Sequence, residues 1–311
     1  MSKVDGVNKK VMLASGEEVR FDKLCIATGG SPVVPAVEGS NLKGVYTLRT
    51  KEDQEAIKAL AENAKSVAVI GGSWIATECA ASLVSKHKDK LKVNLVCPTS
   101  VPFEAVLGKE VGGVIKEEHE ANGVNVIANS RLEKVIDKGD GTVRGVQLST
   151  GACVDADLVI LGTGVKPATQ FLADSGLDMK EDGGLVCNPF LQTSNKDIFA
   201  AGDIVHYPYW PTGDRVRTEH WIVALDQGTY AAFNMLGKVI PYGAIPFFWT
   251  RNYNKSLQYV GRGDGFKEVH ITGDLSARKF LAYYINERDQ VTAVAGMNSG
   301  PAVLTLFEAM Q

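Results

Sequence analysis

The clearest chemical signal in this sequence is a glycine turn between a buried strand and a helix. Residues 67–70 form an apolar run, and residues 74–83 have the spacing of a helix. The residues that join and open these elements are Gly71, Gly72, Ser73, Trp74, Ile75 and Ala76. Strand, glycine turn and helix in this order are typical of a dinucleotide site, because backbone N–H groups at the helix N-terminus bind a pyrophosphate. The pattern predicts that these turn residues contact NAD(P)H.

The turn departs from the G-x-G-x-x-G/A pattern at one position. Ser73 stands where a glycine lets the backbone approach the pyrophosphate, whereas Ala76 is an accepted third residue. The next strand, residues 92–97, is followed by Pro98 and Thr99, with neither an acidic residue for the ribose 2′-hydroxyl nor an arginine in that place. The choice between NADH and NADPH therefore stays open. A strand, turn and helix of purely structural purpose is the alternative interpretation.

Composition and charge narrow the class of protein. The chain has 311 residues, of which 45% are hydrophobic and 22% charged, so it can bury the cores of two or three domains. Its formal net charge of −3, with basic and acidic residues interleaved, argues against nucleic acid as a partner. No apolar stretch approaches the roughly 20 residues that cross a bilayer, and residues 1–6 match neither a signal peptide nor a transit peptide. We expect no transmembrane segment and no targeting signal in this chain.

The cysteines and histidines indicate neither a disulfide nor a metal site. No C-x-x-C pair occurs among Cys25, Cys79, Cys97, Cys153 and Cys187, and most of them lie in apolar segments. We therefore expect buried, reduced thiols in an intracellular, reducing compartment, without an internal redox disulfide. The five histidines are dispersed without metal-ligand spacing, so no metal site is predicted.

Two similar blocks of short strands indicate a repeated architecture. Residues 8–30 and residues 131–167 each contain a β-meander that leads into a buried strand. The strand of the first block ends in the turn Ala27, Thr28 and Gly29, and the strand of the second ends in Gly162, Thr163 and Gly164. We therefore expect two related nucleotide-binding domains, of which only the second is preceded by its own glycine loop.

The predicted elements give an α/β fold with two Rossmann-like domains and a C-terminal α+β domain. Residues 50–172 alternate helix and strand and form the complete domain, with helices expected over 51–63 and 108–122 and a strand over 124–127. Residues 1–49 and 173–237 form an incomplete, discontinuous domain with an open sheet edge. Residues 238–311 contain four short strands and a helix over 301–310, which predict an antiparallel sheet and an aromatic interface domain.

An ordered series of motifs along the whole chain resembles one enzyme family. The motifs are Ala27-Thr28-Gly29, Leu48-Arg49-Thr50, the Gly71 turn, Gly162-Thr163-Gly164, residues 198–203, Glu219-His220-Trp221 with Gln227-Gly228, and residues 246–249. The chain resembles the FAD-dependent, NAD(P)H-linked reductases related to apoptosis-inducing factor and to ferredoxin and rubredoxin reductases. Residues 101–108 are most similar to the apoptosis-inducing-factor-3-like group.

The resemblance implies roles for individual residues. Asp203 is implied to hydrogen-bond the ribityl and pyrophosphate region of FAD, and Arg49 to approach the flavin. The helix opened by Glu219, His220 and Trp221 is implied to face the flavin ring, with Trp249 stacked near it, and Glu78 and Gly164 to lie on the NAD(P)H side. The implied cofactor-binding residues are Ala27, Thr28, Gly29, Arg49, Gly71, Gly72, Ser73, Trp74, Ile75, Ala76, Gly164, Asp203, Glu219, His220 and Trp221, and the implied catalytic residues are Glu78, His220 and Trp249. Capping, helix-dipole and core-packing roles are the alternatives.

The resemblance also sets the cofactors and partners that we expect. Relatives open with a strand, a glycine loop and a helix that bind the FAD pyrophosphate, whereas this chain starts at a later hairpin of that domain, so weak FAD binding is implied. One hypothesis is an FAD- and NAD(P)H-dependent oxidoreductase, mitochondrial or cytoplasmic, that passes electrons to a small redox protein or a quinone. The other is a flavin-free pseudoenzyme that acts as an accessory subunit. In a variant of these, a second copy or another chain completes the FAD domain.

Overall fold

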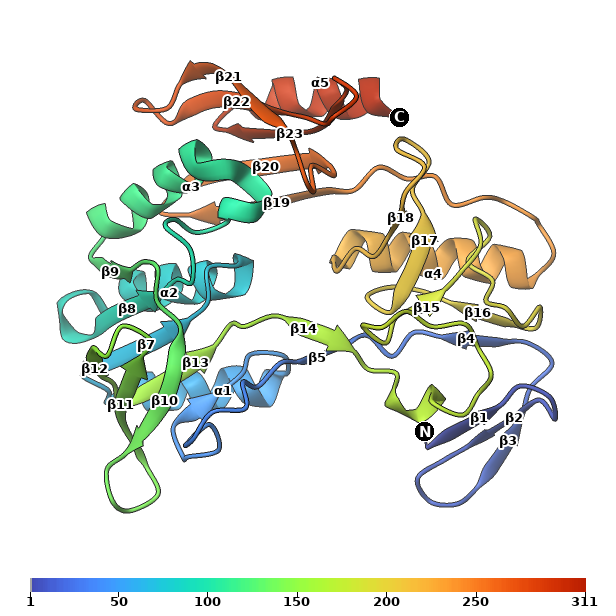
Figure 1. Cartoon of the computed structure of the whole chain (residues 1–311), viewed down its shortest axis with the longest axis horizontal. Coiled ribbons are helices and arrows are strands. Elements are labelled where there is room, and N and C mark those ends of the chain that lie inside the picture. The colour runs from blue at the N-terminus through green and yellow to red at the C-terminus, as the bar shows by residue number, and fades with distance from the viewer. Residues whose placement is uncertain (1) are drawn as a thin grey trace. The chain divides into compact units, whose positions relative to one another are not determined.

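The chain divides into two compact units. The structure, a computed structural model, describes residues 2–311 (Figure 1). Unit 1 contains residues 2–31, Val165–Phe248 and Met310–Gln311, and unit 2 contains Pro32–Gly164 and Trp249–Ala309. Unit 2 contains residues 50–164 of the nucleotide-binding domain predicted over 50–172, together with most of the C-terminal sheet, which the sequence predicts as a separate domain.

A parallel sheet forms the centre of the nucleotide-binding part of unit 2. Its strands, in spatial order, are β6 (Val45–Tyr46), β13 (Leu158–Leu161), β7 (Ser66–Ile70), β8 (Lys92–Val96) and β9 (Val124–Ile127). All neighbouring pairs are parallel. The α/β fold with a parallel sheet that the sequence predicts is therefore confirmed.

Both faces of this sheet are buried, which explains its continuous apolar strands. Val67 and Val69 of β7 belong to the core beneath the helices. Ala68 and Ile70, which point to the opposite face, pack in a second core against Val146 of a neighbouring meander. Because side chains alternate along a strand, a strand covered on both sides must be apolar at every position.

The helices of this part are α1 (Lys51–Ala61), α2 (Trp74–His87) and α3 (Glu104–Ala121). A capping box begins α1, in which Thr50 accepts from the backbone N–H of Asp53 and the Asp53 carboxylate accepts from that of Thr50. The helix predicted from Gly108 onward corresponds to the longer segment of α3, and a short helical segment precedes it. Phe103 enters the helix with φ of 58°, and Gly108, with φ of 77°, kinks it. Glycine at that position therefore separates two helical segments, because its positive φ interrupts the helical backbone.

The predicted pair of meanders is present. The first consists of β1 (Lys3–Asp5), β2 (Lys10–Met12) and β3 (Glu18–Arg20), and the second of β10 (Leu132–Asp137), β11 (Val143–Leu148) and β12 (Cys153–Asp155). Each is antiparallel and is followed by a strand that pairs in parallel, which is β4 (Leu24–Ile26) in the first case and β13 in the second. The repeated block in the sequence therefore corresponds to a repeated fold.

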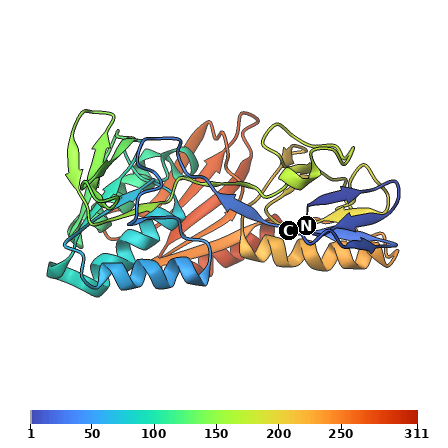
Figure 2. The same ribbon diagram turned by 90° about the horizontal axis from the view of Figure 1, so that it is seen from below.

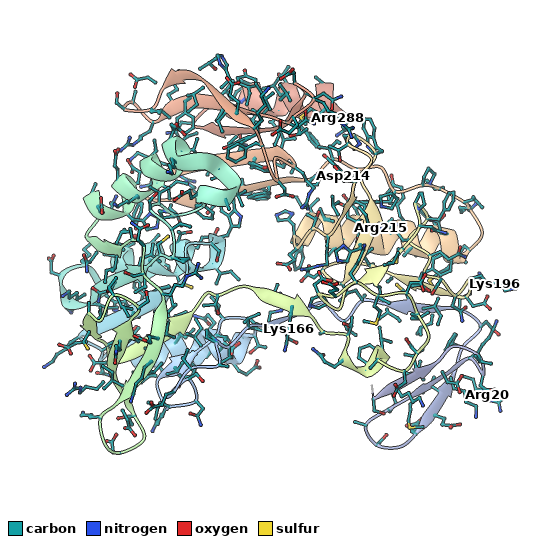
Figure 3. All side chains as sticks on the ribbon, viewed as in Figure 1. Arg20, Lys166, Lys196, Asp214, Arg215 and Arg288 are labelled. Carbon is teal, nitrogen blue, oxygen red and sulfur yellow. The ribbon has the colours of Figure 1, made fainter. Side chains whose placement is uncertain are left out.

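Unit 1 is built around short strands and one helix. In addition to the first meander and β4, its elements are β5 (Gly30–Pro32), β14 (Val165–Pro167), a 3₁₀ turn (Gln170–Leu172), β15 (Leu185–Val186), β16 (Ile198–Ala200), β17 (Val205–Pro208), β18 (Arg215–Val216) and α4 (Trp221–Met235). Figure 2 shows α4 along one side of these strands. Arg215 donates to the carbonyls of Cys187 and His206, whereas Arg20 and Lys196 are exposed to solvent (Figure 3).

The C-terminal part of unit 2 is an antiparallel sheet with a helix, as predicted. The prediction of four strands was wrong, because β19 (Phe247–Asn252) adds a fifth at the edge. Beside it lie, in spatial order, β20 (Lys255–Gly261), β23 (Val291–Met297), β22 (Lys279–Ile285) and β21 (Glu268–Asp274), and the chain continues into α5 (Gly300–Met310). β19 is an edge strand whose single pairing partner is β20.

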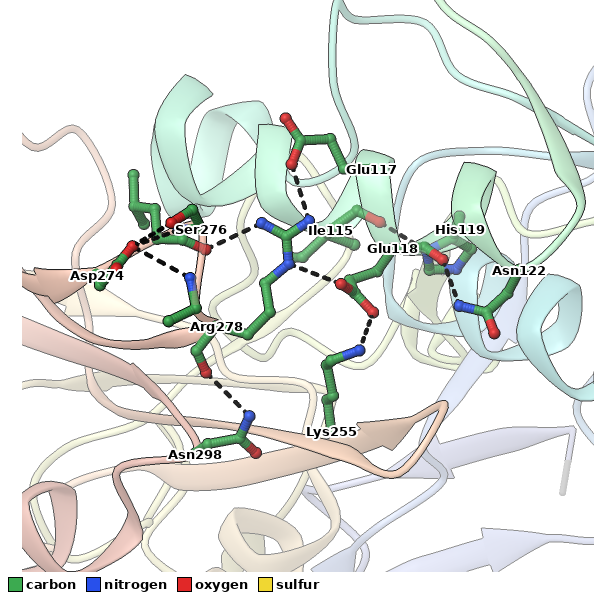
Figure 4. A network of polar contacts seen from close by, with 12 residues as sticks. Ile115, Glu117, Glu118, His119, Asn122, Lys255, Asp274, Ser276, Arg278 and Asn298 are labelled. Carbon is green, nitrogen blue, oxygen red and sulfur yellow. Dashed lines mark hydrogen bonds and ion pairs between the residues drawn. The ribbon is translucent and has the colours of Figure 1, made fainter.

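Charged residues join α3 to this sheet. Figure 4 shows Glu118 of α3 accepting from Lys255 Nζ and from Arg278 Nε, each at 2.6 Å. Arg278 also donates to Glu117 at 2.9 Å. Partial burial opposes ionisation of Glu118, yet the hydrogen bonds from both cations hold its pKa below the ordinary value. The network helps to explain why the C-terminal sheet and the parallel sheet belong to one compact unit.

The cysteines are all free thiols, and the predicted burial applies to some of them. Cys79, Cys97 and Cys187 are buried, and burial raises the pKa of Cys79 to about 11. Cys153 lies exposed on β12, so the expectation of burial was wrong there. It is part of a surface meander, whose strands are covered on one side only.

Candidate functional site

The glycine turn between β7 and α2 is held in a conformation that requires glycine. Gly71 has φ of +130°, and a Cβ atom there would lie 2.2 Å from the carbonyl oxygen of Gly162. A Cβ at Gly72 would lie 2.6 Å from the sulfur of Cys97. The first two residues of the turn therefore let the backbone pass between the ends of β13 and β8.

The hydroxyl of Ser73 is directed away from the end of α2. Ser73 is the N-cap residue, but its side chain makes no capping hydrogen bond. Instead, Ser73 Oγ donates to the carbonyl oxygen of Gly162 at 3.1 Å. The serine at the second glycine position therefore leaves the first turn of α2 without a side-chain cap, so its N-terminus keeps its electrostatic attraction for an anion.

Close packing between α2 and β13 supports the turn. Ala76 is fully buried, and a Cβ at Gly162 would lie 2.8 Å from the Cβ of Ala76. These small residues give the helix–strand approach that the third position of the fingerprint requires. Thr77 strengthens the first turn by donating to the carbonyl of Ser73 at 3.0 Å.

The segment after β8 folds back onto the turn. The N–H of Phe103 donates to the carbonyl of Gly72 at 3.0 Å, and the rings of Phe103 and Trp74 lie 4.1 Å apart between centroids. Glu104 accepts from both the backbone N–H and the hydroxyl of Ser100. The hydrogen bond from the Ser100 hydroxyl is the main reason that the pKa of Glu104 is lowered.

These segments enclose a cleft of about 620 Å³. Its lining residues come from the turn, the carboxyl ends of the strands and the segment after β5, and are Val33, Pro35, Ile70, Gly71, Gly72, Ser73, Trp74, Val96, Pro98, Thr99, Phe103, Glu104, Ala105, Val106, Ser130, Arg131, Leu132, Gly162, Thr163 and Gly164. The volume is within the roughly 300–1,000 Å³ typical of small-molecule sites. With an uncapped helix N-terminus and glycine backbone at one wall, the cleft fits a dinucleotide.

A second group of predicted residues gathers in unit 1, at the carboxyl ends of β4 and β16. Ala27, Thr28 and Gly29 follow β4, and Asp203 follows β16. The two strands are parallel neighbours, and the hydroxyl of Thr28 donates to the carbonyl of Ala168 at 2.8 Å. Ligands of open α/β sheets bind at the carboxyl ends of their strands, so the topology agrees with a cofactor role for this group.

Arg217 connects this group to the start of α4. Its guanidinium donates to the carbonyl oxygen of Asp203 at 2.9 Å and to the carboxylates of Glu219 and Asp182. His220 is the N-cap of α4, and its Nδ1 accepts from the N–H of Ile222 at 3.3 Å. Burial lowers the pKa of His220, with Asp203 opposing the shift. The structure therefore brings two predicted residues, Asp203 and Glu219, together around one arginine.

The remaining predicted residues lie elsewhere. Glu78 is on α2 but outside the cleft, and its Oε1 accepts from the hydroxyl of Thr250 at 2.6 Å. It lines a shallow groove of unit 2 together with Trp249 of β19, which is 57% exposed. Arg49 precedes α1 and its backbone N–H donates to Asp53. Trp221, in unit 1, is 80% exposed.

Several residues of the cleft were not predicted from the sequence. Arg131, Ser130 and Leu132 follow β9, and Val33 and Pro35 follow β5, far from the glycine turn in the chain. Arg131 lies in the short segment between β9 and β10, and this place could have indicated it, because the carboxyl ends of neighbouring parallel strands meet at one edge of the sheet.

Comparison with known proteins identifies the family. Residues 1–228 match the pyridine nucleotide-disulphide oxidoreductase family, and residues 247–310 match the reductase C-terminal family. The chain belongs to the pyridine nucleotide-disulphide oxidoreductases. The predicted resemblance is thereby confirmed.

The relatives of this oxidoreductase chain include a mammalian protein and bacterial reductases. It is 35% identical to apoptosis-inducing factor 3 of Mus musculus over 308 residues, which cover 99% of the chain and 50% of that protein. It is 30% identical to rhodocoxin reductase of Rhodococcus erythropolis, covering 90% of the chain and 64% of that protein. The chain therefore spans about half the length of the mammalian relative and about two thirds of the bacterial one.

Solved structures show the same fold. A ferredoxin reductase from Rhodopseudomonas palustris superposes with a TM-score of 0.91 at 29% identity, covering 98% of this chain and 74% of that one. The covalent putidaredoxin reductase–putidaredoxin complex gives a TM-score of 0.92 at 28% identity, covering 99% of this chain and 73% of that one. The mixed α/β architecture with a C-terminal antiparallel sheet is that of the ferredoxin reductases.

Two further features of the described residues concern membranes and metals. No helix in residues 2–311 combines the length and apolar character that crossing a bilayer requires. Within the same residues, no group of three or more His, Cys, Asp or Glu side chains is placed to hold a metal ion.

Proposed function

We propose that this oxidoreductase chain binds NAD(P)H in the cleft beside the Gly71 turn and takes part in electron transfer to a small, ferredoxin-type redox protein, through FAD. The observation that carries the proposal is the cleft itself, with the uncapped start of α2 at one wall. Relatives with this architecture are named ferredoxin reductases, and one was solved as a complex with putidaredoxin. A quinone is the alternative acceptor.

Different residues of the cleft contact different parts of the dinucleotide. The turn at Gly71 and Gly72 brings backbone close to a pyrophosphate, and the aromatic pair Trp74 and Phe103 closes one side of the cleft. Mostly apolar walls exclude water from the bound ligand, which strengthens the remaining polar contacts. The hydroxyl of Thr163 donates to the carbonyl of Val33 at 2.6 Å and joins the two walls.

Unit 1 offers less support for FAD than the cleft of unit 2 offers for the dinucleotide. Within residues 2–31 and 165–248, the α-helix is α4, and its first turn is capped by His220. The described residues of unit 1 therefore do not form a pyrophosphate cradle comparable to that at α2. When bound, a flavin supplies the step from hydride to single electrons. The roles proposed for Asp203, Glu219, Trp221, Arg49 and Trp249 toward it stay predictions.

The capped start of α4 favours a second candidate function. A flavin-free chain that keeps the reductase scaffold would serve as an accessory subunit, or would share an FAD site with a second copy or another chain. Such a chain folds without flavin and does not oxidise NAD(P)H. A mitochondrial or cytoplasmic location is proposed for either function, and fractionation of cells that express the chain would test it.

Calorimetric titration of the purified chain with NADPH and NADH tests the dinucleotide site. We expect saturable binding that is weakened at least tenfold by Ala105→Trp, because Ala105 is an exposed residue of the cleft wall. Ala121→Trp is the matched control, since Ala121 is exposed at the other end of α3. No binding of either nucleotide, or equal weakening by both substitutions, would overturn the proposal.

The visible spectrum tests the flavin. FAD is added to the chain, followed by NAD(P)H under anaerobic conditions and then by an oxidised ferredoxin. A flavin band that is bleached by the nucleotide and restored by the ferredoxin supports the reductase. A folded chain that binds nucleotide yet takes up no FAD favours the accessory subunit.

A further inference from the structure

The ends of β8 and β9 are tied together at the wall of the cleft. The N–H of Ser130 donates to the carbonyl of Cys97 at 3.0 Å, and the N–H of Asn129 donates to that of Thr99 at 2.9 Å. Cys97 directly follows β8, where an acidic residue in a Rossmann domain binds the ribose 2′-hydroxyl. Arg131, one residue beyond Ser130, therefore lies beside the position at which such a site distinguishes NADH from NADPH.

Arg131 is held at this position by its backbone. Its N–H donates to the hydroxyl of Ser149 at 3.1 Å, and its carbonyl accepts from the N–H of Ser149 at 2.9 Å. The residue is exposed to solvent and lines the cleft. Across residues 2–311 no carboxylate forms an ion pair with its guanidinium. The side chain is therefore available to an anion in the cleft.

The charges of the cleft also favour an anion at this end. Among the described lining residues, Glu104 and Arg131 are the charged ones. The Glu104 carboxylate already accepts two hydrogen bonds from Ser100 and lies 3.9 Å from Lys109 Nζ. Its charge is thus partly balanced within its own segment, whereas that of Arg131 is not. The carboxyl end of β8 contributes a thiol at Cys97 and no negative charge.

We propose that the cleft prefers NADPH to NADH because Arg131 binds the 2′-phosphate of the adenosine ribose. The inference rests on the proposed dinucleotide site and specifies its ligand. A planar guanidinium can donate two parallel hydrogen bonds to a phosphate, and such charge-assisted bonds are roughly twice as strong as neutral ones. Without an acid at the end of β8, the 2′-phosphate meets no carboxylate there, and the 2′-hydroxyl of NADH lacks its usual acceptor.

Glu104 is the residue through which the cleft would prefer NADH instead of NADPH. If its carboxylate turned to accept from a ribose 2′-hydroxyl, the cleft would prefer NADH, and Glu104→Gln would weaken NADH binding. Under the proposal, Glu104→Gln removes a nearby negative charge and leaves the preference for NADPH intact or larger. This substitution therefore separates the two arrangements.

Calorimetry on the full chain provides the test. The Kd values for NADPH and NADH are compared, together with those for 2′,5′-ADP and 5′-AMP, which carry the 2′-phosphate difference without nicotinamide. We expect NADPH to bind at least tenfold tighter than NADH, and Arg131→Ala to bring the ratio close to one. Arg131→Lys should keep part of the preference, because it retains the charge but not the fork.

Arg144→Ala is the matched control. Arg144 is exposed on β11, belongs to the same unit and is not part of the cleft wall. Equal affinity of the wild-type chain for both nucleotides, tighter binding of NADH, or a ratio unchanged by Arg131→Ala would overturn the inference while leaving the dinucleotide site in place. Binding of neither nucleotide would overturn the proposed function, and the inference with it.

Discussion

The N-termini of α2 and α4 differ in what occupies their first turn. At α2 the N-cap Ser73 directs its hydroxyl to Gly162, so no side chain caps the helix. At α4 the imidazole of His220 accepts from the N–H of Ile222. α2 follows the parallel strand β7 through a glycine turn and opens on a cleft, whereas α4 follows β18, which pairs antiparallel with β17.

The difference shows that helix direction alone does not make an anion site. Every α-helix has unpaired N–H groups and the positive end of its dipole at the N-terminus, but a capping side chain accepts a hydrogen bond from one of these N–H groups. In this chain the tertiary contact between Ser73 and Gly162 keeps one helix end uncapped. A local contact within two residues caps the other. Substitutions at Ser73 and His220 should therefore change whether a side chain caps α2 or α4.

The largest expected effect follows from removing the turn that precedes α2. Gly71→Ala should lower the free energy of unfolding by about 3 kcal/mol, because the new Cβ meets a carbonyl oxygen and φ is positive. Urea unfolding followed by circular dichroism measures the change. Gly113→Ala is the control, since its Cβ would meet nothing within 4 Å, and it should be neutral or stabilising. A Gly71→Ala protein as stable as wild type would contradict this account of the turn.

Closing the α2 end with a carboxylate is the next test. Ser73→Asp should weaken NADPH binding by about tenfold, since a fixed negative charge at the helix N-terminus repels the pyrophosphate and competes for the same N–H groups. Titration calorimetry measures it. Ser85→Asp adds the same charge at an exposed position near the other end of α2 and should leave binding within twofold. Unchanged binding by Ser73→Asp would show that the α2 end does not hold the phosphates.

Removing the side-chain cap of α4 should have a smaller effect on the free energy of unfolding. His220→Ala removes the capping bond to Ile222 and should cost about 1 kcal/mol. His220→Asn can accept the same bond and should recover most of the loss. Thermal unfolding of the two variants beside wild type gives the comparison, and equal losses for both would assign the role of His220 to packing against Phe248 instead.

The smallest expected effect is a pH dependence confined to α4. Burial lowers the pKa of His220 in the folded chain below its unfolded value, so the unfolded chain binds more protons as the pH falls. The His220 contribution to stability is therefore complete above about pH 6.5 and declines below it. Comparing unfolding free energies at pH 7.5 and 5.5, wild type should lose a few tenths of a kcal/mol more than His220→Asn. An equal loss in both proteins would exclude this contribution.

Local sequence was sufficient for the regular parts of unit 2. The alternation of Val67 and Val69 with Ala68 and Ile70 predicts a strand buried on both faces, and both cores are present. The glycine turn and the start of α2 at Trp74 were also predictable. These features depend on backbone geometry and on a hydrophobic period, which are encoded within about ten consecutive residues.

Features that depend on distant partners were predicted less well. Strand β19 pairs with β20, and a short helical segment that the sequence did not predict lies between Phe103 and Gly108, where the N–H of Phe103 donates to the carbonyl of Gly72. Glu78 accepts a hydrogen bond from Thr250 and does not line the cleft, and its place on the NAD(P)H side stays a prediction. Helix periodicity places Glu78 on α2, but it does not say which neighbour that face meets.

The sequence by itself determined the family, through motifs along the whole chain, and the buried strand and glycine turn of residues 67–76, which neighbouring residues encode. Only the tertiary structure decided what surrounds the turn. It brings Gly162 to the hydroxyl of Ser73 and joins Ser130 to Cys97, which places Arg131 beside the end of β8. The physical reason is that a parallel sheet sets the ends of strands from distant segments side by side, a neighbourhood that no local pattern contains.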